Sequence, residues 1–325
     1  YSLMLTFLYC LDKNYNIQAF TSIISLLENI DEPIKILMLH KEPDTFLENK
    51  FYKEIKNRKN LSEIQIFNFH KEKVEFPKLS NVHVSEATYY RIYISNYIPN
   101  EQDILIYLDP DVICIKDPVK DLRKKINELK VSDEIIAAST ETYKESEDDK
   151  EFKRLGMKGS EYFNAGFMLI DYLKWQNNNI TDNLVTKLFQ IFDNVVFWDQ
   201  DVINSYFDGK YIKLDNRYNF KINLEPESLR TYENSDMEYV NEEVYFVHYS
   251  GKFKPWTVRG ALHFSSKYYQ NYYKKLSSSN YHIDNNWKVQ ALKDLSKSIF
   301  TLRIFKISNS FSFIFAVVKF LYSKR

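Results

Sequence analysis

Cysteine and glycine are both scarce in this chain of 325 residues. The two cysteines, Cys10 and Cys114, lie in or beside apolar runs, which indicates buried thiols and argues against a disulfide or a zinc site. Because only six glycines are present, we expect each of them to lie where the backbone requires it.

The chain also lacks a net charge, since 44 basic residues balance 44 acidic ones. Composition therefore gives no support to a nucleic-acid partner. A membrane-spanning run is missing as well, because the most apolar stretch, Phe311 to Tyr322, is short and contains Lys319. Residues 1–11 are apolar but have neither a basic leader nor a small-residue cleavage site, so we expect a cytoplasmic protein.

Apolar residues are plentiful, at 44% of the chain, and their spacing predicts alternating strands and helices. Strands are predicted at 2–11, 34–39 and 63–70, with helices at 17–29 and 45–58 between them. This alternation favours an α/β protein with a parallel sheet. Further helices are predicted at 85–97, 121–130, 172–193 and from 199, and further strands at 104–108, 134–139, 167–170, 211–214 and 243–247. The charged segment 141–158 is interpreted as a flexible surface or a loosely packed helix, and 216–230 shows no clear periodicity.

The stretch from Ile104 to Ile113 is the one around which we organise the chain. It begins as a continuous apolar run, typical of a strand buried on both faces, and is then interrupted by Asp109 and Asp111. Pro110 suits the end of a strand, where ligands bind in open α/β sheets. Residues at i and i+2 on extended chain point the same way, so both carboxylates can bind one Mg²⁺ or Mn²⁺ that holds a diphosphate. The alternative is a solvated turn.

Three further residues allow two interpretations each. His248 closes an apolar run and is either a structural histidine or the third member of an Asp/Asp/His set for Mn²⁺. Lys254 is either a solvated surface lysine or a phosphate contact. Arg91, among tyrosines on a predicted helix, is either an ordinary ion-pair residue or a member of the site.

Two short motifs are also open to two interpretations. Asn164-Ala165-Gly166 forms either a strand-entry turn or a close backbone approach to a ligand, with the Asn amide on hydroxyl groups. Asp199-Gln200-Asp201 either caps a helix and places acids in its first turn, or presents acids and amides to sugar hydroxyls.

Taken together, these groups resemble the family 8 retaining glycosyltransferases, among them the bacterial lipooligosaccharide α-1,4-galactosyltransferases and the glycogenins. The resemblance runs from about residue 3 to about residue 260 and implies a GT-A type nucleotide-diphospho-sugar transferase fold, a Rossmann-like mixed sheet flanked by helices. Six motifs carry it, in the family's order: Asp12-Lys13-Asn14-Tyr15, Thr88-Tyr89-Tyr90-Arg91, Tyr107-Leu108-Asp109-Pro110-Asp111, Tyr162-Phe163-Asn164-Ala165-Gly166, Asp199-Gln200-Asp201, and His248-Tyr249-Ser250-Gly251 with Lys254-Pro255-Trp256.

The resemblance also implies roles for single residues in binding a UDP-sugar. Asp109, Asp111 and His248 would ligate Mn²⁺, with Mg²⁺ as the alternative ion. Asp12 would bond the uracil edge, Asn14 the ribose, and Tyr15 would stack on the base, while Cys10 would contribute only backbone. The sugar would be held by Arg91, Asn164, Asp199 and Gln200, beside Ala165, and the diphosphate by Gly251 and Lys254. Two positions depart from the family pattern: Pro110 is stiffer than the usual small residue, and Ser250 stands where cysteine is frequent.

The expected reaction is transfer of a hexose, with retention, from a UDP-sugar to a sugar hydroxyl of a bacterial surface glycan or glycoprotein. Galactose is the first choice of donor sugar and glucose the second. Since the sequence offers no obvious carboxylate nucleophile and Gln200 is a poor one, we favour front-face attack with Gln200 and Asp199 stabilising the sugar. The alternatives are a metal-dependent UDP-sugar hydrolase and a nucleotide-sugar-binding protein that has lost catalysis.

The last segment differs in character from the rest. We expect a catalytic domain at 1–275 and a helical, basic and amphipathic extension at 276–325. Beyond residue 292 seven basic residues face one acid, Asp294. Apolar residues from Phe300 to Leu321 recur at helical steps and predict a continuous apolar stripe. Such a helix suits an anionic membrane surface, here the inner face of the cell membrane, or a dock on its own domain or on a partner subunit.

Overall fold

The structure is a computed structural model that describes residues 4–70, 76, 85–224, 234–277, 281–307 and 309–323. In this part of the chain a seven-stranded mixed sheet has the order β3-β2-β1-β4-β7-β6-β8. Strand β7 is antiparallel to both of its neighbours, and the other pairs are parallel. The strands are β1 (Leu5–Leu11), β2 (Ile34–His40), β3 (Leu61–Asn68), β4 (Ile104–Leu108), β6 (Ile136–Tyr143), β7 (Glu161–Asp171) and β8 (Ile212–Leu214).

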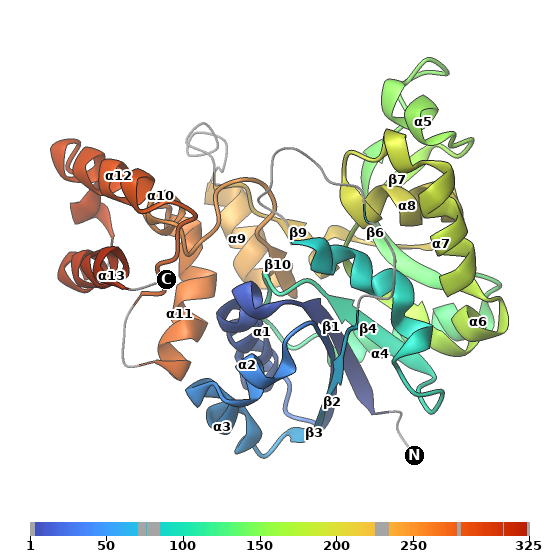
Figure 1. The fold of residues 1–325 in the computed structure, drawn as a ribbon, viewed down its shortest axis with the longest axis horizontal. Helices are drawn as coiled ribbons and strands as arrows, with labels where there is room; N and C mark the ends of the chain where they lie inside the picture. Colours follow the sequence, from blue (N-terminus) through green and yellow to red (C-terminus); the bar gives the residue numbers. More distant parts are fainter. Residues whose placement is uncertain are drawn as a thin grey trace.

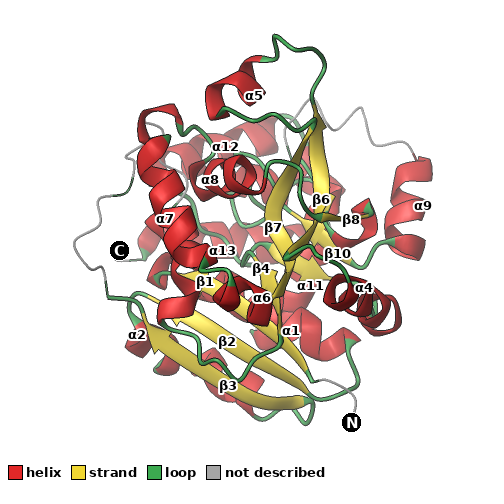
Figure 2. Ribbon diagram, turned by 90° about the vertical axis from the view of Figure 1, so that its right-hand side faces the viewer, coloured by secondary structure: helices red, strands yellow, loops and turns green. Residues whose placement is uncertain are grey.

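Both faces of this sheet are covered, because alternate residues of its apolar strands point to opposite sides. Phe7 and Tyr9 of β1 pack in the cluster that contains α1 (Asn16–Asn29), α2 (Pro43–Leu47), α3 (Lys50–Lys56), α4 (Val119–Val131) and the end of α11 (Lys267–Leu276). Leu8 and Cys10 pack in the other cluster, with η2 (Glu86–Asn96), α5 (Lys150–Leu155), α6 (Tyr172–Asn177), α7 (Ile180–Gln190) and α8 (Trp198–Phe207). Figure 1 shows these layers, and Figure 2 shows the twist between the β1–β3 half and the β6–β7 half.

A second, small sheet of order β5-β10-β9 brings distant segments together. Strand β5 (Val112–Cys114) pairs antiparallel with β10 (Phe246–His248), and His248 lies opposite Val112. Strand β9 (Phe220–Lys221) pairs with the other edge of β10. This sheet therefore places His248 beside Asp111.

The remaining elements are α9 (Asn234–Glu243), α10 (Val258–Ala261), α12 (Lys288–Phe300), α13 (Ser310–Tyr322), η1 (Lys13–Tyr15), η3 (Phe192–Asn194), η4 (Asn216–Tyr218), η6 (Phe264–Ser266) and η7 (Arg303–Lys306).

The predicted α/β order is confirmed, but two predicted helices are each split in two. The helix predicted at 45–58 is α2 followed by α3, because Asn49 caps α3 by accepting a hydrogen bond from the Phe51 amide at 3.1 Å. The helix predicted at 172–193 breaks between α6 and α7, where Asn179 has a φ of 50°. Ser85 begins the segment at 85–97 as a cap, but that segment is a 3-10 helix.

One loop interpretation is wrong, and another is correct only in part. Asn164-Ala165-Gly166 lies inside the long strand β7 and forms no strand-entry turn. The segment 141–158 is partly ordered into regular structure, because β6 continues to Tyr143 and α5 buries Phe152 and Leu155 against the sheet. Both cysteines are buried free thiols, as expected. Residues 1–3 and 225–233, parts of the predicted first strand and of the aperiodic segment, lie outside the described residues.

The C-terminal helices lie at the opposite end of the molecule from α5–α8 (Figure 1). The prediction of one continuous apolar stripe is wrong, because the chain turns at Leu302 and Asn309, which have φ values of 56° and 60°. Ile304 is buried whereas Phe300 and Phe311 are exposed, so the predicted stripe is divided between two faces. The inner face packs on α10 and Tyr281. No helix in the described part of the chain is long and apolar enough to cross a membrane.

Candidate active site

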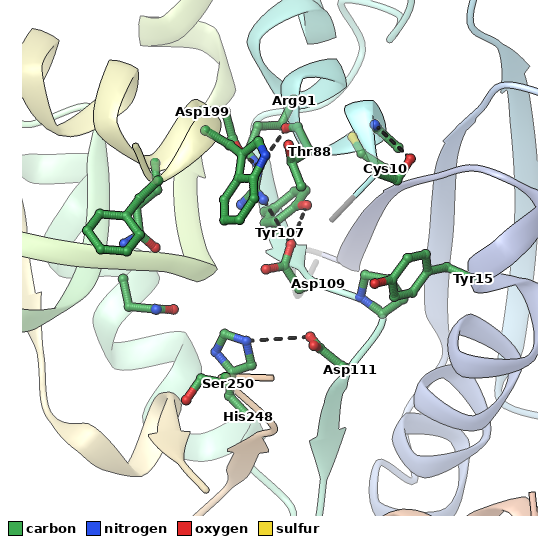
Figure 3. Close-up of a pocket in the computed structure, with 18 of the residues that line it drawn as sticks. Cys10, Tyr15, Thr88, Arg91, Tyr107, Asp109, Asp111, Asp199, His248 and Ser250 are labelled. Atoms are coloured by element: carbon green, nitrogen blue, oxygen red, sulfur yellow. Dashed lines mark hydrogen bonds and ion pairs between the residues drawn. The ribbon is translucent and has the colours of Figure 1, made fainter. Parts of the chain in front are cut away.

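A pocket of about 610 Å³ opens where β1 and β4 end and the small sheet meets the large one. Twelve of the fifteen predicted site residues line it, and Figure 3 shows several of them converging from separate elements. The twelve are Cys10, Tyr15, Arg91, Asp109, Pro110, Asp111, Asn164, Asp199, Gln200, His248, Gly251 and Lys254.

Three other predicted residues do not line this pocket. Asp12 is buried beside it and accepts hydrogen bonds from the Asn14 amide and the Ser85 hydroxyl. Asn14 is exposed in η1. Ala165 is buried in β7, where its amide donates to Gln200 Oε1 at 3.0 Å and its carbonyl accepts from Arg91.

Asp109, Asp111 and His248 form the group in the described chain that can hold a metal ion. One ligand atom from each lies within 4.8 Å of the other two, and His248 Nε2 is 3.4 Å from Asp111 Oδ1. The two carboxylates follow β4 directly, and β10 delivers the imidazole. Two carboxylate oxygens and one imidazole nitrogen form a donor set that suits Mn²⁺ and related divalent cations, so these residues fit a metal.

Asn219 orients the His248 imidazole. The amide nitrogen of Asn219 donates to Asn164 Oδ1 at 2.9 Å, so its carbonyl oxygen is the atom that faces His248 Nδ1, also at 2.9 Å. Because this oxygen can only accept, His248 carries its proton on Nδ1 and presents the lone pair of Nε2 toward Asp111. A hydrogen bond of this kind is what metal-ligating histidines usually make behind the metal.

Gly166 provides the space for the same imidazole. A Cβ atom on Gly166 would lie 2.3 Å from His248 Cε1 and 2.7 Å from Nδ1. These separations are far below van der Waals contact, so only glycine is compatible with the observed ring position. The expected close approach at Asn164-Ala165-Gly166 is present, but the imidazole makes it.

Lys254 adds a positive charge to the metal group. Its Nζ lies 2.7 Å from Asp111 Oδ2 and donates to the Tyr249 carbonyl at 2.6 Å. Burial alone would raise the pKa of Asp111, but the Lys254 ammonium holds that pKa well below its usual range. Asp111 is therefore an ionised carboxylate prepared to bind a cation.

Arg91 joins the metal group to Asp199. Its Nη2 donates to Asp109 Oδ1 at 2.9 Å, its Nε lies 2.6 Å from Asp199 Oδ2, and its guanidinium stacks on the Tyr107 ring. Burial raises the pKa of Asp199 to about 7, although Arg91 opposes this shift. Arg91 is thus no ordinary surface ion-pair residue, because its charge is buried between two acids of the pocket.

Gln200 and Asn164 meet at a carboxylate that the sequence analysis missed, Glu141. Glu141 Oε2 accepts from Asn164 Nδ2 at 3.0 Å and from Gln200 Nε2 at 3.2 Å, and the other oxygen contacts Lys221. Burial raises the pKa of Glu141, yet Lys221 and the hydrogen bond from Asn164 lower it overall. Asn219 was missed as well. Each lies in a segment in which no periodicity or motif marked it.

Asp199 and Gln200 occupy the first turn of α8 and line the pocket, so both interpretations of their motif hold in part. The N-cap residue is Phe197, which makes no side-chain cap. Asp201, in contrast, turns away from the pocket and accepts from the Val196 and Phe197 amides at 2.7 and 2.8 Å.

Residues 6–259 match the model of glycosyl transferase family 8. The chain is 29% identical over 268 residues to the lipopolysaccharide 1,3-galactosyltransferase of Salmonella typhimurium, covering 81% of this chain and 76% of that protein. It is 28% identical over 275 residues to a lipopolysaccharide 1,2-glucosyltransferase of Escherichia coli, with coverage of 81% and 76%.

Solved structures agree in fold. The galactosyltransferase LgtC, solved with donor and acceptor sugar analogues, has a TM-score of 0.64 at 21% identity, covering 84% of this chain and 96% of that one. The glycosyltransferase GlyE of Streptococcus pneumoniae has a TM-score of 0.59 at 20% identity, covering 92% and 64%. The predicted GT-A type fold is thereby confirmed. Because the family model spans most of the sequence, this chain belongs to glycosyl transferase family 8 and is a glycosyltransferase.

Proposed function

We propose that this glycosyltransferase transfers a hexose from a UDP-sugar, with retention of configuration, to a sugar hydroxyl of a bacterial surface glycan. The observation that carries the proposal is the convergence of Asp109, Asp111, His248 and Lys254 in one pocket. Relatives named lipopolysaccharide galactosyl- and glucosyltransferases support a lipopolysaccharide-type acceptor. Galactose is the favoured donor sugar and glucose the second.

Asp109, Asp111 and His248 would hold Mn²⁺, which neutralises charge on the diphosphate when it is bound. Lys254 contacts Asp111, one of the proposed metal ligands, so its ammonium would lie within range of a diphosphate bound there and would stabilise the UDP leaving group. The Gly251 backbone, with a φ of 88°, belongs to the same loop and would contact the diphosphate.

At the nucleoside end, Tyr15 would stack on uracil, Asp12 would accept from the base and Asn14 would bond the ribose, with Cys10 offering backbone alone. Tyr15 lines the pocket and packs edge-on against Trp256 at 6.3 Å between ring centroids. Trp256, which is distant in the sequence, thus packs against the Tyr15 ring and helps to hold its position.

At the sugar end, Arg91, Asn164, Asp199 and Gln200 would hold the hexose. Both carboxylates at this end of the pocket are already paired, which makes them poor nucleophiles. Asp199 is buried against Arg91. Glu141 contacts Lys221, Asn164 and Gln200. We therefore favour front-face attack by the acceptor hydroxyl, with Gln200 and Asp199 stabilising the positive charge that develops on the sugar. A glycosyl adduct on Asp199 or Glu141, found by intact mass spectrometry, would contradict this mechanism.

UDP release from a panel of UDP-sugars tests the proposed function. With Mn²⁺ and lipopolysaccharide core as acceptor, we expect release from UDP-galactose first and UDP-glucose second, and none with EDTA. Release that is equally fast without any acceptor would identify a hydrolase. No release from any donor would contradict catalysis by this chain on UDP-sugars.

We also propose that the extension at 276–325 binds the anionic inner surface of the cell membrane, which would bring the catalytic domain at 1–275 to its acceptor. Phe311 and Phe315 of α13 are 86% and 69% exposed. The exposed basic side chains of the same region are Lys293, Lys297, Arg303, Lys306 and Lys319. Exposed aromatic rings among cations fit a membrane interface with anionic lipids.

Vesicle co-sedimentation tests this membrane proposal. The pair Phe311→Ser and Phe315→Ser should weaken binding to vesicles that contain phosphatidylglycerol, because it removes apolar surface and leaves the charge unchanged. The matched pair Val131→Ser and Leu173→Ser, which removes exposed apolar residues far from the tail, should bind like the wild type. Equal sedimentation of both pairs would contradict the proposal.

A further inference from the structure

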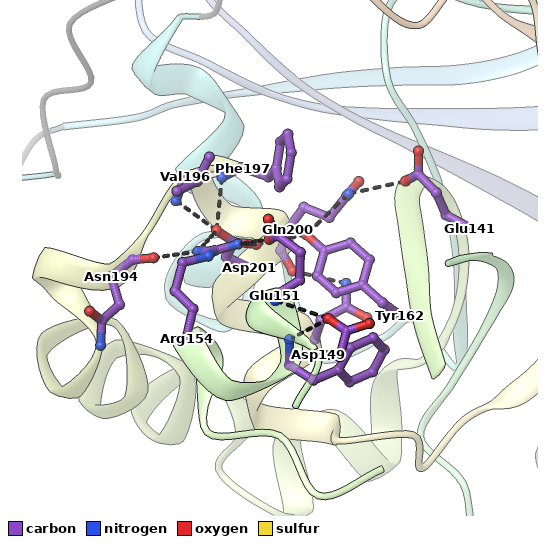
Figure 4. A network of polar contacts seen from close by, with 12 residues as sticks. Glu141, Asp149, Glu151, Arg154, Tyr162, Asn194, Val196, Phe197, Gln200 and Asp201 are labelled. Carbon is purple, nitrogen blue, oxygen red and sulfur yellow. Dashed lines mark hydrogen bonds and ion pairs between the residues drawn. The ribbon is translucent and has the colours of Figure 1, made fainter. Parts of the chain in front are cut away.

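Figure 4 shows a line of polar side chains that passes through Gln200. It begins with Arg154 of α5, passes through Asp201 and Tyr162, reaches the Gln200 amide and ends on Glu141. Of these groups Arg154 and Asp201 do not line the pocket. The proposed reaction gives them no role, so their arrangement requires a separate explanation.

Asp201 acts as a hydrogen-bond acceptor toward every partner. It is completely buried. Oδ2 accepts from Arg154 Nη1 and from the Val196 and Phe197 amides, and Oδ1 lies 3.3 Å from Arg154 Nη2 and 2.8 Å from the Tyr162 hydroxyl. Guanidinium and backbone N–H groups can only donate, so the carboxylate is held in its accepting state.

This fixes the direction of the Tyr162 hydroxyl. Burial, followed by the charge of Asp201, raises the pKa of Tyr162 well above its usual value, so the phenol keeps its proton. The Tyr162 hydroxyl therefore donates its hydrogen bond to Asp201, because the carboxylate has no proton with which to donate one. The remaining lone pairs of the Tyr162 oxygen then face Gln200, whose Nε2 lies 3.2 Å away.

The direction of Tyr162 in turn selects one of the two orientations of the Gln200 amide. Because the Tyr162 oxygen can only accept from Gln200, the NH₂ group of Gln200 must face it. The Glu141 carboxylate, 3.2 Å from the same Nε2, also needs a donor. The carbonyl oxygen of Gln200 is then the atom that receives the Ala165 amide at 3.0 Å. In the flipped amide, the Gln200 oxygen would face two acceptors, Tyr162 and Glu141, and its NH₂ group would face the Ala165 N–H donor.

We propose that Tyr162 is a positioning residue that locks the Gln200 amide in this single orientation, with Asp201 and Arg154 setting the direction of its hydroxyl. The inference rests on the proposed function, in which Gln200 stabilises charge developing on the sugar. A dipole that is fixed before the reaction stabilises such charge without reorganisation. The benefit therefore appears in the chemical step and not in donor binding, where the metal group and Lys254 dominate.

Tyr162→Phe tests this assignment, because it removes the hydroxyl and keeps the ring. We expect kcat to fall on the order of tenfold, as for the loss of other hydrogen bonds that orient functional side chains, while the KM for the UDP-sugar and the Mn²⁺-dependent Kd for UDP change less than about twofold. Tyr211→Phe is the matched control. Tyr211 is also a buried residue, and its hydroxyl bonds Thr140 and Glu161 but not Gln200.

Thermal unfolding of both variants separates positioning from general destabilisation. A similar loss of Tm in both, with a kcat loss in Tyr162→Phe alone, supports the inference. Equal kcat values for Tyr162→Phe and the wild type would overturn it and leave the proposed function intact. Equal kcat losses in the two variants would also overturn it, because a structural role would then suffice. A wild-type chain that turns over no UDP-sugar would overturn the proposed function and this inference together.

Discussion

At the scale of single residues, the metal group depends on a glycine that is not itself a ligand. His248 can lie where it does only because Gly166 has no Cβ, and it presents Nε2 only because Asn219 accepts from Nδ1. The position of His248, one of the three proposed ligands, is therefore set by residues behind it, an arrangement that is usual for histidines at metal sites.

Gly166→Ala should displace the His248 imidazole, because the new methyl group would overlap it. We expect the Mn²⁺-dependent affinity for UDP to fall by about tenfold or more, measured by titration calorimetry. Gly209→Ala is the control. Gly209 has a φ of 83°, so alanine there is destabilising through backbone strain, but the residue lies outside the pocket lining. Unchanged UDP affinity in Gly166→Ala would contradict the assignment of His248 as a ligand.

Residues within recognisable motifs could be predicted from the sequence, but their supporting partners could not. Glu141 reaches Asn164 through the pairing of β6 with β7, in which the register shifts twice. Asn219 reaches His248 through the short pairing of β9 with β10. Register shifts and two-residue strands leave no periodic signal in the sequence, so neither contact could be read from it.

At the scale of elements, apolar periodicity predicted where strands and helices lie but not where helices end. Both split helices break at an asparagine that caps or turns the chain. Such residues are visible in the sequence, yet whether they interrupt a helix depends on the packing of each half. The same limit explains α5, a short helix within a charged segment that is ordered by its two buried apolar residues.

Gly156 ends α5 with a φ of 67°, and nothing lies within 4 Å of the Cβ that it lacks. Gly156→Ala should therefore lower the free energy of unfolding by about 1 kcal/mol through backbone strain alone. Gly156→Asn should cost less, since asparagine tolerates this conformation better. Urea unfolding measures both, and a larger loss for asparagine than for alanine would contradict the interpretation.

At the scale of the whole molecule, the C-terminal segment supports the loop that carries Lys254. Gln270 of α11 donates to the carbonyls of Pro255 and His282 and accepts from the His282 amide. The ring of His282 packs against Trp256, Tyr269 and Tyr273. Residues beyond the proposed catalytic domain thus take part in the core behind the pocket.

This core predicts a loss of stability in acid. Burial lowers the pKa of His282 to about 3, whereas in the unfolded chain a histidine titrates near 6.5. The unfolded state therefore binds the proton first, so the stabilisation from neutral His282 is complete above about pH 6.5 and is lost progressively as the pH falls toward 3. By pH 5 about 2 kcal/mol is lost.

Urea unfolding at pH 7 and pH 5 measures this contribution. His282→Phe keeps an aromatic ring and should show a loss between the two pH values that is smaller than in the wild type by about 2 kcal/mol. The exposed His70 provides the control, because His70→Phe should leave the pH-dependent loss unchanged. An identical loss in wild type and His282→Phe would exclude His282 as its source.

The most direct test of the central claim is the binding of UDP measured by titration calorimetry with and without Mn²⁺. Three proteins are compared: the wild type, Asp111→Asn, and Asp193→Asn, which removes the same charge from an exposed position. The Asp/Asp/His site predicts that Mn²⁺ strengthens UDP binding by the wild type and by Asp193→Asn, and that Asp111→Asn abolishes this effect. Equal binding by all three proteins, or binding that EDTA leaves unchanged, would contradict a metal-bridged diphosphate in this pocket.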